Sequence, residues 1–326
     1  MGPDLKTVLL MDPIAAEGES VLSKSVQLLK SPDSSPDTIR RLARDADGII
    51  IRSKLPDDIF EAAPRVKAVA IHGTGTDLVP LEQASKHGVM VSNLPGVNAQ
   101  SVAEFVVMGM LMLGRNIVAI TSAMRNEPWD EARKRGIASM ELDGRTVGIV
   151  GVGEIGRRVA KICRQGLGMQ VLGFQRNLSR LPEGVKGVSL ENLLKESDFV
   201  VVACPLTPET RHLLNEKTLG LMKKRAWVIN VGRGAVINEQ DLMTSLKNKS
   251  IAGAMLDVYE QYRLPPDHEL FKLDNVLLTP HLAGVTVAAR GRASVAAAAE
   301  MLRMLSGERP LNLVNPDVLH ARAAHH

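Results

Sequence analysis

Short apolar segments alternate with longer segments of mixed polarity along most of this chain. A buried parallel strand reads as a short apolar run, whereas a helix that covers a sheet is apolar on one side only. The alternation therefore predicts α/β units with parallel sheets. In the first part, the expected strands are Thr7–Met11, Gly48–Ile51, Val66–Ile71 and Val89–Val91, and the expected helices are Asp37–Ala46, Asp57–Ala62 and Leu81–Lys86.

A second alternating series begins at Thr146. Its expected strands are Thr146–Val150, Gln170–Phe174, Phe199–Ala203, Trp227–Asn230, Ile251–Asp257 and Asn275–Leu278. Its expected helices are Ile155–Arg164, Leu190–Lys195, Glu216–Met222 and Glu239–Lys247. This order is typical of a doubly wound, parallel-sheet dinucleotide-binding domain. The first series predicts a smaller, flavodoxin-like α/β domain.

Two helical segments stand apart from this alternation. The segment Asn98–Thr121 is apolar on nearly every face, so we expect a helix buried between domains or between subunits. The last helix, Val285–Leu305, is too long to belong only to the second sheet and is expected to return to the first domain. The predicted domains are therefore residues 1–98 with 293–326, and residues 99–292.

Composition narrows the class of protein. The chain has 326 residues, of which 45% are hydrophobic and only 3% aromatic, so two domains with aliphatic cores are expected. The net charge of +4 is spread along the chain without a dense basic run, which argues against nucleic acid and suits anionic small molecules. We expect no metal site, and we interpret the histidine-containing tail, residues 320–326, as a frayed terminus.

The sequence also predicts a cytoplasmic location. The longest apolar stretch, Phe105–Leu113, is too short to span a bilayer, and Met1–Lys6 shows no signal-peptide pattern. The two cysteines, Cys163 and Cys204, form no C-x-x-C pair and are expected to be buried, reduced thiols.

The run Gly151-Val152-Gly153-Glu154-Ile155-Gly156 is the most informative motif. An expected strand precedes it and an expected helix follows it. In this context the glycines permit a tight turn, close approach of a pyrophosphate and close packing of the helix on the strand. Gly151, Gly153 and Gly156 therefore predict a dinucleotide site.

The residues after the next strand bear on the cofactor. An NAD-binding unit places a carboxylate there to bind the ribose hydroxyls. This chain has Gln175, Arg176 and Asn177 instead, followed by Arg180. Because guanidinium groups bind a 2′-phosphate bidentately, we expect NADP(H) in preference to NAD(H). The alternative is that Arg176 and Arg180 are solvated loop charges and that NAD is used.

Candidate catalytic residues follow three late strands. In an open α/β sheet ligands bind at the carboxyl ends of the strands, where Arg233, Asp257 and His281 are expected. Hydride transfer to a carbonyl needs a cation that polarises the oxygen and an acid that delivers a proton. We assign the first role to Arg233 and the second to His281.

Together with the glycine motif and the candidate catalytic residues, further segments make the chain resemble the D-2-hydroxyacid dehydrogenase family over nearly its whole length. The matching segments are Gly73–Asp77, Asn98–Glu104, the glycine motif, Asn230–Gly234, Asp257–Tyr259 and Thr279–His281. The resemblance implies a split substrate domain, a homodimer built around the long buried helix, and reversible reduction of small 2-keto acids such as glyoxylate or hydroxypyruvate to D-2-hydroxy acids.

The resemblance also implies site residues. Substrate contacts are expected from Thr74 and Gly75 and from the loop of Arg52 and Ser53. Further cofactor contacts are expected at Glu154, Ile155, Cys204, Pro205, Thr210, Val231, Gly232, Asp257 and Gly284.

The chain departs from the family at one catalytic position. Tyr262 stands where the family has a glutamate, five residues after Asp257. A carboxylate beside an imidazole favours its protonated form, whereas a neutral phenol only hydrogen-bonds. We therefore expect keto-acid reduction to fall off at lower pH than in relatives with glutamate. Alternatives are that Glu260 supplies the carboxylate, that Tyr262 lines the substrate pocket, or that catalysis is weakened.

The expected function is therefore NAD(P)-dependent reduction of a 2-keto acid. The alternative is a dinucleotide-binding regulatory protein on the same scaffold, with little or no dehydrogenase activity. The retention of both Arg233 and His281 weighs against this alternative. A formate or phosphite oxidase is disfavoured because relatives with those activities carry different inserts.

Overall fold

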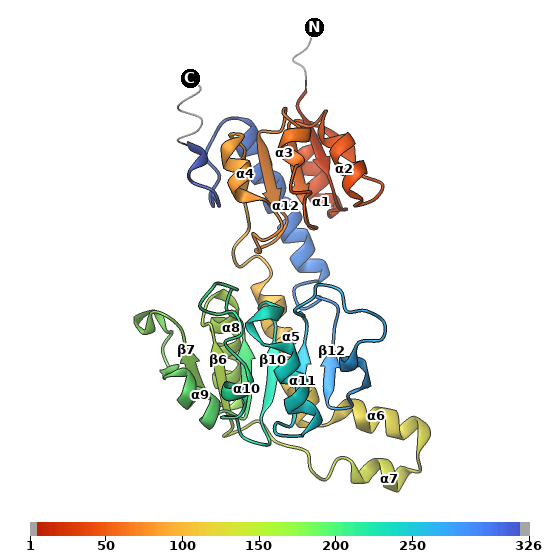
Figure 1. Cartoon of the computed structure of the whole chain (residues 1–326), viewed down its shortest axis with the longest axis vertical. Coiled ribbons are helices and arrows are strands. Elements are labelled where there is room, and N and C mark those ends of the chain that lie inside the picture. The colour runs from red at the N-terminus through yellow and green to blue at the C-terminus, as the bar shows by residue number, and fades with distance from the viewer. Residues whose placement is uncertain (1–4, 320–326) are drawn as a thin grey trace. The chain divides into compact units, whose positions relative to one another are not determined.

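The computed structural model describes residues 5–319, so the tail assigned to residues 320–326 lies outside the described part (Figure 1). The chain forms two compact units. Unit 1 comprises Met1–Asn98 and Val285–His326, and unit 2 comprises Ala99–Gly284. The sequence placed the second boundary at 292/293. It lies earlier because helix α12, Val287–Leu305, is continuous and packs against the helix and strands of unit 1 that are described next.

Unit 1 is built on a five-stranded parallel sheet. The strand order is β2-β1-β3-β4-β5, which is flavodoxin-like and agrees with the fold class expected for this domain, although the strand β2 was not predicted. The strands are β1 Thr7–Leu10, β2 Gln27–Lys30, β3 Gly48–Ile51, β4 Ala68–Ile71 and β5 Met90–Ser92. The helices are α1 Ala16–Leu22, α2 Pro36–Ala43, α3 Ile59–Ala62, α4 Leu81–Lys86 and α12.

Helices cover both faces of this sheet. One apolar cluster joins β3 and β4 to α2, α3 and α4, and the other joins the opposite face to α1 and α12. Helices α1 and α12 approach closely, since a Cβ on Gly18 would lie 2.6 Å from the carbonyl oxygen of Ser294. The β3 strand is buried throughout, which explains why its apolar run predicts it correctly.

Unit 2 is built on a seven-stranded parallel sheet with the order β12-β11-β10-β9-β6-β7-β8. This is the doubly wound order with one strand added at the edge, and it confirms the predicted fold class. The strands are β6 Thr146–Val150, β7 Gln170–Phe174, β8 Lys186–Gly187, β9 Phe199–Val202, β10 Trp227–Asn230, β11 Gly253–Leu256 and β12 Val276–Leu278.

Two helical layers enclose the sheet of unit 2. The α-helices of this unit are α5 Ala99–Gly114, α6 Ile117–Asn126, α7 Trp129–Lys134, α8 Glu154–Leu167, α9 Leu190–Glu196, α10 Glu216–Leu219 and α11 Glu239–Lys247. The 3-10 helices are η1 Leu178–Arg180, η2 Gly234–Val236 and η3 Glu269–Lys272. Helices α5 and α8 pack on one face, and α9, α10 and α11 pack on the other.

The long apolar segment is not one continuous helix. Asn116 adopts a left-handed backbone conformation with φ of 51°, which separates α5 from α6. Along α5, Met108 and Leu111 are each 42% exposed, so the expected burial is incomplete in the single chain. Among the described residues no single helix meets the length and hydropathy required to cross a membrane. Only the α5–α6 pair does so jointly, and it is bent by 56°.

Candidate active site

The glycine motif forms the turn between β6 and α8. Gly151 has φ of 94°, and a Cβ there would lie 2.7 Å from the backbone of Cys204. A Cβ on Gly156 would lie 2.5 Å from the carbonyl oxygen of Gly151, so this glycine lets α8 pack closely on the turn. A Cβ placed on Gly153 would have no other protein atom within 4 Å, so there is open space at the start of the helix.

The first turn of α8 is suited to an anion. Gly153 precedes the helix as its N-cap and provides no side-chain cap, so the first backbone N–H groups are available to a ligand. Such groups, together with the helix dipole, favour a pyrophosphate. Glu154 pairs with Arg158 at 2.7 Å along the exposed side of the helix, and Ile155 packs against the core cluster. The turn therefore fits a dinucleotide.

The segment after β7 carries exposed arginines. Gln175 donates to the carbonyl of Asn177 at 2.7 Å, and the Asn177 side chain accepts from the N–H of Ser179 at 3.0 Å. These bonds hold a tight turn from which Arg176 and Arg180 extend to solvent. The segment from residue 175 to residue 180, which follows β7, thus contains two guanidinium groups and no carboxylate side chain.

The end of β9 lies against the glycine turn. Cys204 is 8% exposed and contacts the Gly151 turn, and burial raises the pKa of its thiol to about 11. Burial likewise raises the pKa of Cys163 to about 12, so both thiols stay protonated near neutral pH. Thr210 donates to the carbonyl of Pro205 at 2.8 Å, which closes the loop that begins at Cys204.

The turn that carries Arg233 is held by a buried amide. Asn230 is 1% exposed, accepts from the N–H of Gly232 at 3.1 Å and donates to the carbonyl of Arg233 at 3.1 Å. The Arg233 guanidinium donates to the carbonyl of Gly232 at 2.9 Å, and Val231 is buried beneath the turn. The arginine is thus partly buried on a turn whose backbone is fixed.

A single carboxylate holds the loop that carries His281. Asp257 is 1% exposed, and its oxygens accept from Thr279 Oγ1 at 2.7 Å, Leu282 N at 2.7 Å and Ala283 N at 2.9 Å. The backbone N–H of His281 donates to the carbonyl of Asp257 at 2.9 Å. His281 has φ of 57°, an uncommon conformation that these bonds stabilise. Asp257 therefore has a structural role in this loop, which ends at Gly284.

Arg233 and His281 both lie at the carboxyl ends of the strands of the sheet. They follow β10 and β12, which flank β11 in the strand order. The Arg233 turn also packs against the segment after β11, since a Cβ on Gly234 would lie 1.8 Å from the carbonyl oxygen of Tyr259. The carboxyl ends of β10, β11 and β12 thus present a cationic side chain and an imidazole together.

Tyr262 and Glu260 follow β11 in the next few residues. The rings of Tyr262 and His281 are 5.9 Å apart between centroids and inclined at 67°. The Glu260 carboxylate bonds instead to His212 Nε2 at 2.7 Å and accepts from the N–H of Glu239 at 3.4 Å. Sequence reasoning missed His212 and Glu239, because their contacts with Glu260 depend on the path of the chain in space and no sequence motif marks them.

The substrate residues expected in unit 1 also follow strands. The Asp12 carboxylate accepts from the N–H groups of Arg52 and Ser53 at 2.7 and 2.9 Å and so holds the turn after β3. After β4, Thr74 Oγ1 donates to the carbonyl of Leu94 at 3.1 Å, and the carbonyl of Thr74 accepts from Asn93 at 2.6 Å. Gly75 is the next residue of this turn.

His72 is a further residue of unit 1 that sequence reasoning missed. It is 8% exposed, and its Nε2 lies 2.7 Å from Ser294 Oγ. The Ser294 hydroxyl donates to the carbonyl of Arg290 at 2.8 Å, so the imidazole is the donor to the hydroxyl. Burial lowers the pKa of His72 to about 4, and the charge of Arg52 adds to this shift. The imidazole is therefore neutral.

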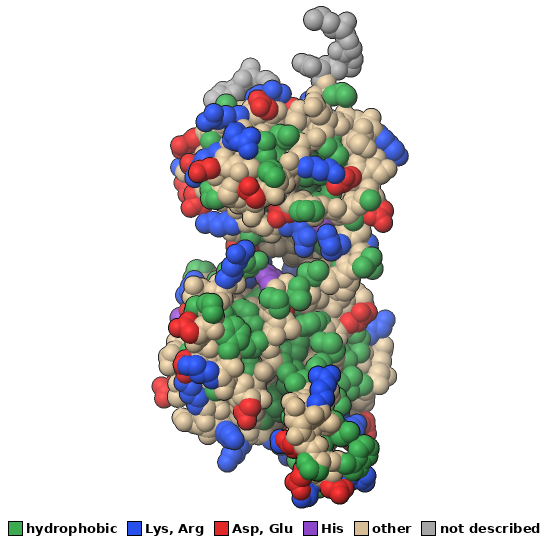
Figure 2. All heavy atoms as spheres, turned by 90° about the vertical axis from the view of Figure 1, so that its right-hand side faces the viewer, with side chains coloured by type: hydrophobic (Ala, Val, Ile, Leu, Met, Phe, Trp, Pro, Cys, Tyr) green, Lys and Arg blue, Asp and Glu red, His purple; other side chains and the backbone are tan. Residues whose placement is uncertain are grey.

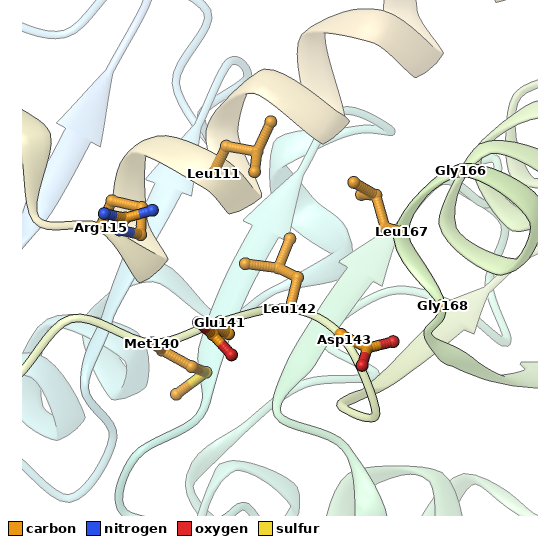
Figure 3. A pocket seen from close by; sticks show the side chains of 9 residues that line it. All are labelled: Leu111, Arg115, Met140, Glu141, Leu142, Asp143, Gly166, Leu167 and Gly168. Carbon is orange, nitrogen blue, oxygen red and sulfur yellow. The ribbon is translucent and has the colours of Figure 1, made fainter.

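One pocket of about 440 Å³ lies elsewhere on unit 2 (Figure 3). It is lined by the ends of α5 and α8 and by residues 140–143, which precede β6. This position is at the amino ends of the strands, so the pocket is separate from the candidate site. Among residues 5–319 no group of three or more histidine, cysteine, aspartate or glutamate side chains could hold a metal ion.

Comparison with known proteins identifies the family. A sequence model described as "D-isomer specific 2-hydroxyacid dehydrogenase, NAD binding domain" matches residues 107–283. The chain is 37% identical to a glyoxylate reductase from Thermofilum pendens, with 89% of this chain and 87% of the relative covered.

Two solved structures bear on the cofactor. An NADPH-dependent glyoxylate/hydroxypyruvate reductase from Sinorhizobium meliloti, in complex with NADP and malonate, matches with a TM-score of 0.83 and 27% identity, covering 96% of this chain and 97% of the other. An NAD-dependent formate dehydrogenase from Staphylococcus aureus in complex with NAD has the same TM-score and identity, covering 94% and 97%. The chain therefore belongs to the D-isomer specific 2-hydroxyacid dehydrogenase family and is an NAD(P)-dependent oxidoreductase.

Proposed function

We propose that this protein reduces small 2-keto acids of the glyoxylate and hydroxypyruvate type, with NADP(H) preferred over NAD(H). The observation that carries this proposal is the common position of Arg233 and His281 at the carboxyl ends of β10–β12. The names of the T. pendens and S. meliloti proteins support the choice of substrate. They do not favour the alternative of a regulatory protein without activity.

In the proposed reaction Arg233 acts first as a binding group. Its guanidinium would pair with the substrate carboxylate and polarise the keto oxygen, because a fixed cation stabilises the negative charge that develops there. The Asn230-held turn limits how far this side chain can move. NADPH supplies the hydride when it is bound.

His281 would donate the proton that completes the reduction. A histidine whose ordinary pKa lies near neutrality can deliver a proton to an alkoxide oxygen as it forms. The bonds from the backbone N–H groups of His281 and Leu282 to Asp257 fix the backbone that carries the imidazole.

The cofactor preference rests on the segment after β7. Arg176 and Arg180 would pair with a 2′-phosphate, and each charge-assisted bond is worth a factor of about 10 to 100 in affinity. The double variant Arg176→Ala/Arg180→Ala should raise KM for NADPH while leaving KM for NADH nearly unchanged. Arg309→Ala, which removes an exposed charge from unit 1, is the control.

We further propose that the turn of Arg52 and Ser53 and the turn of Thr74 and Gly75 bind the substrate carboxylate, and that the protein acts as a cytoplasmic homodimer.

The homodimer is supported by large hydrophobic side chains left exposed on α5, α6 and α7. Figure 2 shows such side chains gathered on one face of unit 2. We call α5, α6, α7 and the residues up to Ile137 the exposed hydrophobic arm; its exposed large hydrophobic residues are Met108, Leu111, Ile117, Val118, Met124, Trp129 and Ile137.

The proposed function is tested by cofactor oxidation against a panel of 2-keto acids. The purified protein is given NADPH or NADH with glyoxylate, hydroxypyruvate, pyruvate and larger keto acids. We expect turnover of the small keto acids with a higher kcat/KM for NADPH. Cofactor binding without turnover of any keto acid would contradict the proposal and favour the regulatory alternative.

A further inference from the structure

Tyr262 is an exposed aromatic residue that makes a defined ring contact. Its side chain is 70% exposed, so it contributes little to the apolar core. Even so, its ring meets the imidazole of His281 edge to face, at 5.9 Å between centroids. A buried structural role does not explain a tyrosine here, whereas a role toward the imidazole does.

We propose that Tyr262 is a positioning residue that orients the His281 imidazole through its aromatic ring, rather than through its hydroxyl. This inference rests on the proposed function, since it assigns His281 to proton delivery. An inclined aromatic contact at this separation restricts the rotation of both rings. It orients the imidazole without adding a negative charge, which the glutamate of the family would add.

The segment that carries Tyr262 is held on its N-terminal side. The Tyr259 hydroxyl donates to the carbonyl of Thr279 at 2.8 Å, which ties this segment to the His281 loop. Glu260 and Glu239 bond reciprocally, since each carboxylate accepts from the other's backbone N–H at 3.4 and 3.2 Å. Tyr262 therefore follows a fixed stretch of chain, although its own side chain is exposed.

The carboxylate nearest along the chain has other partners. Glu260 Oε1 bonds to His212 at 2.7 Å, and Glu239 Oε1 lies 3.2 Å from His268 Nε2. The Glu260 carboxylate is therefore bonded to the His212 side chain and to the backbone at the start of α11. The ring of Tyr262 contacts the imidazole of His281, whereas the Glu260 carboxylate bonds to the imidazole of His212.

The kinetic test compares Tyr262→Phe with Tyr262→Leu. The phenylalanine keeps the ring, so kcat should stay within about 3-fold of the wild type. The leucine removes it, so kcat should fall about 10- to 100-fold with a smaller change in KM, because a misaligned acid slows the proton step more than binding. Phe271→Leu, which removes another exposed aromatic ring of unit 2, is the control and should leave kcat unchanged.

The structural test does not depend on turnover. The NMR signals of the His281 imidazole protons, assigned by their loss in His281→Gln, should carry a ring-current shift in the wild type and in Tyr262→Phe. The shift should disappear in Tyr262→Leu and persist in Phe271→Leu. Equal thermal unfolding midpoints would show that each variant is folded.

Each outcome decides the inference. Equal kcat in the wild type and Tyr262→Leu, or an equal loss in the phenylalanine and leucine variants, would overturn a role for the ring. If the wild type turns over no keto acid, the proposed function fails, and the NMR comparison alone decides: an imidazole shift that is identical in the wild type and Tyr262→Leu overturns the inference, and a shift lost only in the leucine variant supports the ring contact.

Discussion

At the scale of single residues, burial of the His72 side chain disfavours its protonated form. Its pKa falls from 6.5 to about 4, mainly by desolvation and then by the charge of Arg52. The native imidazole is neutral, whereas the unfolded chain binds a proton below about pH 6.5. The stability associated with His72 is therefore complete above that pH and is lost as the pH falls toward 4.

The variant His72→Gln isolates this effect. The free energy of unfolding of the wild type, relative to the variant, should fall by on the order of 3 kcal/mol between about pH 7 and about pH 4. Urea denaturation of both proteins at the two pH values measures the difference. A difference that does not change with pH would show that His72 does not titrate as the structure indicates.

A substitution at Gly153 is expected to change ligand binding without changing folding. A Cβ at this position meets no protein atom within 4 Å, so Gly153→Ala should fold normally. The same Cβ would occupy the space where a pyrophosphate approaches α8, so Kd for NADPH should rise at least about 10-fold. Gly166→Ala, also in open space but at the other end of α8, is the control and should bind NADPH as the wild type does. Titration of NADPH fluorescence measures both affinities, and equal values would contradict the assignment of the turn.

Tyr262→Glu tests the departure from the family. A carboxylate beside an imidazole stabilises its protonated form, so the variant should sustain keto-acid reduction to higher pH than the wild type. The pH profile of kcat for both proteins is the measurement. Coincident profiles would mean that the residue at this position does not govern proton delivery.

Residue types and spacing predicted where several residues of the candidate site lie in the fold. Gly151, Arg233 and His281 follow strands, and the carboxyl ends of neighbouring parallel strands are brought together by the fold. The partners of the polar side chains were not predictable in the same way. Glu260 lies two residues from Tyr262 yet bonds to His212, 48 residues away in the chain, and only the path of the loops decides this pairing.

At the scale of elements, the accuracy of the prediction follows burial. Strands β6, β7 and β10 were predicted with the bounds that the structure shows, because they are central strands with largely apolar sequences. The edge strand β2, with exposed Gln27 and Lys30, gave no such pattern and was missed. The break at Asn116 was missed as well, because a single left-handed residue leaves no trace in the hydrophobic pattern.

At the scale of elements, we predict that substitutions in the exposed hydrophobic arm change the oligomeric state. If this arm, including Ile137 just after α7, forms the subunit interface, Ile137→Glu should convert the dimer to a monomer, since Ile137 is 82% exposed in the single chain and a buried charge is costly. Leu311→Glu, with the same 82% exposure in unit 1, should leave the dimer intact. Light scattering after size-exclusion chromatography gives the molar mass, and a monomeric wild type would refute the proposed homodimer.

At the scale of the whole molecule, two parallel-sheet units account for the division of roles. The doubly wound sheet of unit 2 positions the glycine turn, Arg233 and His281 at the carboxyl ends of its strands. The flavodoxin-like sheet of unit 1 positions the turns after β3 and β4 by the same rule. The alternation of apolar segments predicted the fold class of both units but not the strands β2 and β8, and the boundary at residue 284 depended on where α12 begins.

The most direct measurement is the rate of NADPH oxidation with glyoxylate by the wild type, His281→Gln and the control His87→Gln, an exposed histidine of unit 1. Proton delivery by His281 predicts that kcat falls about 100-fold or more in His281→Gln and stays unchanged in His87→Gln. A His281→Gln variant that turns over glyoxylate as fast as the wild type would contradict the account.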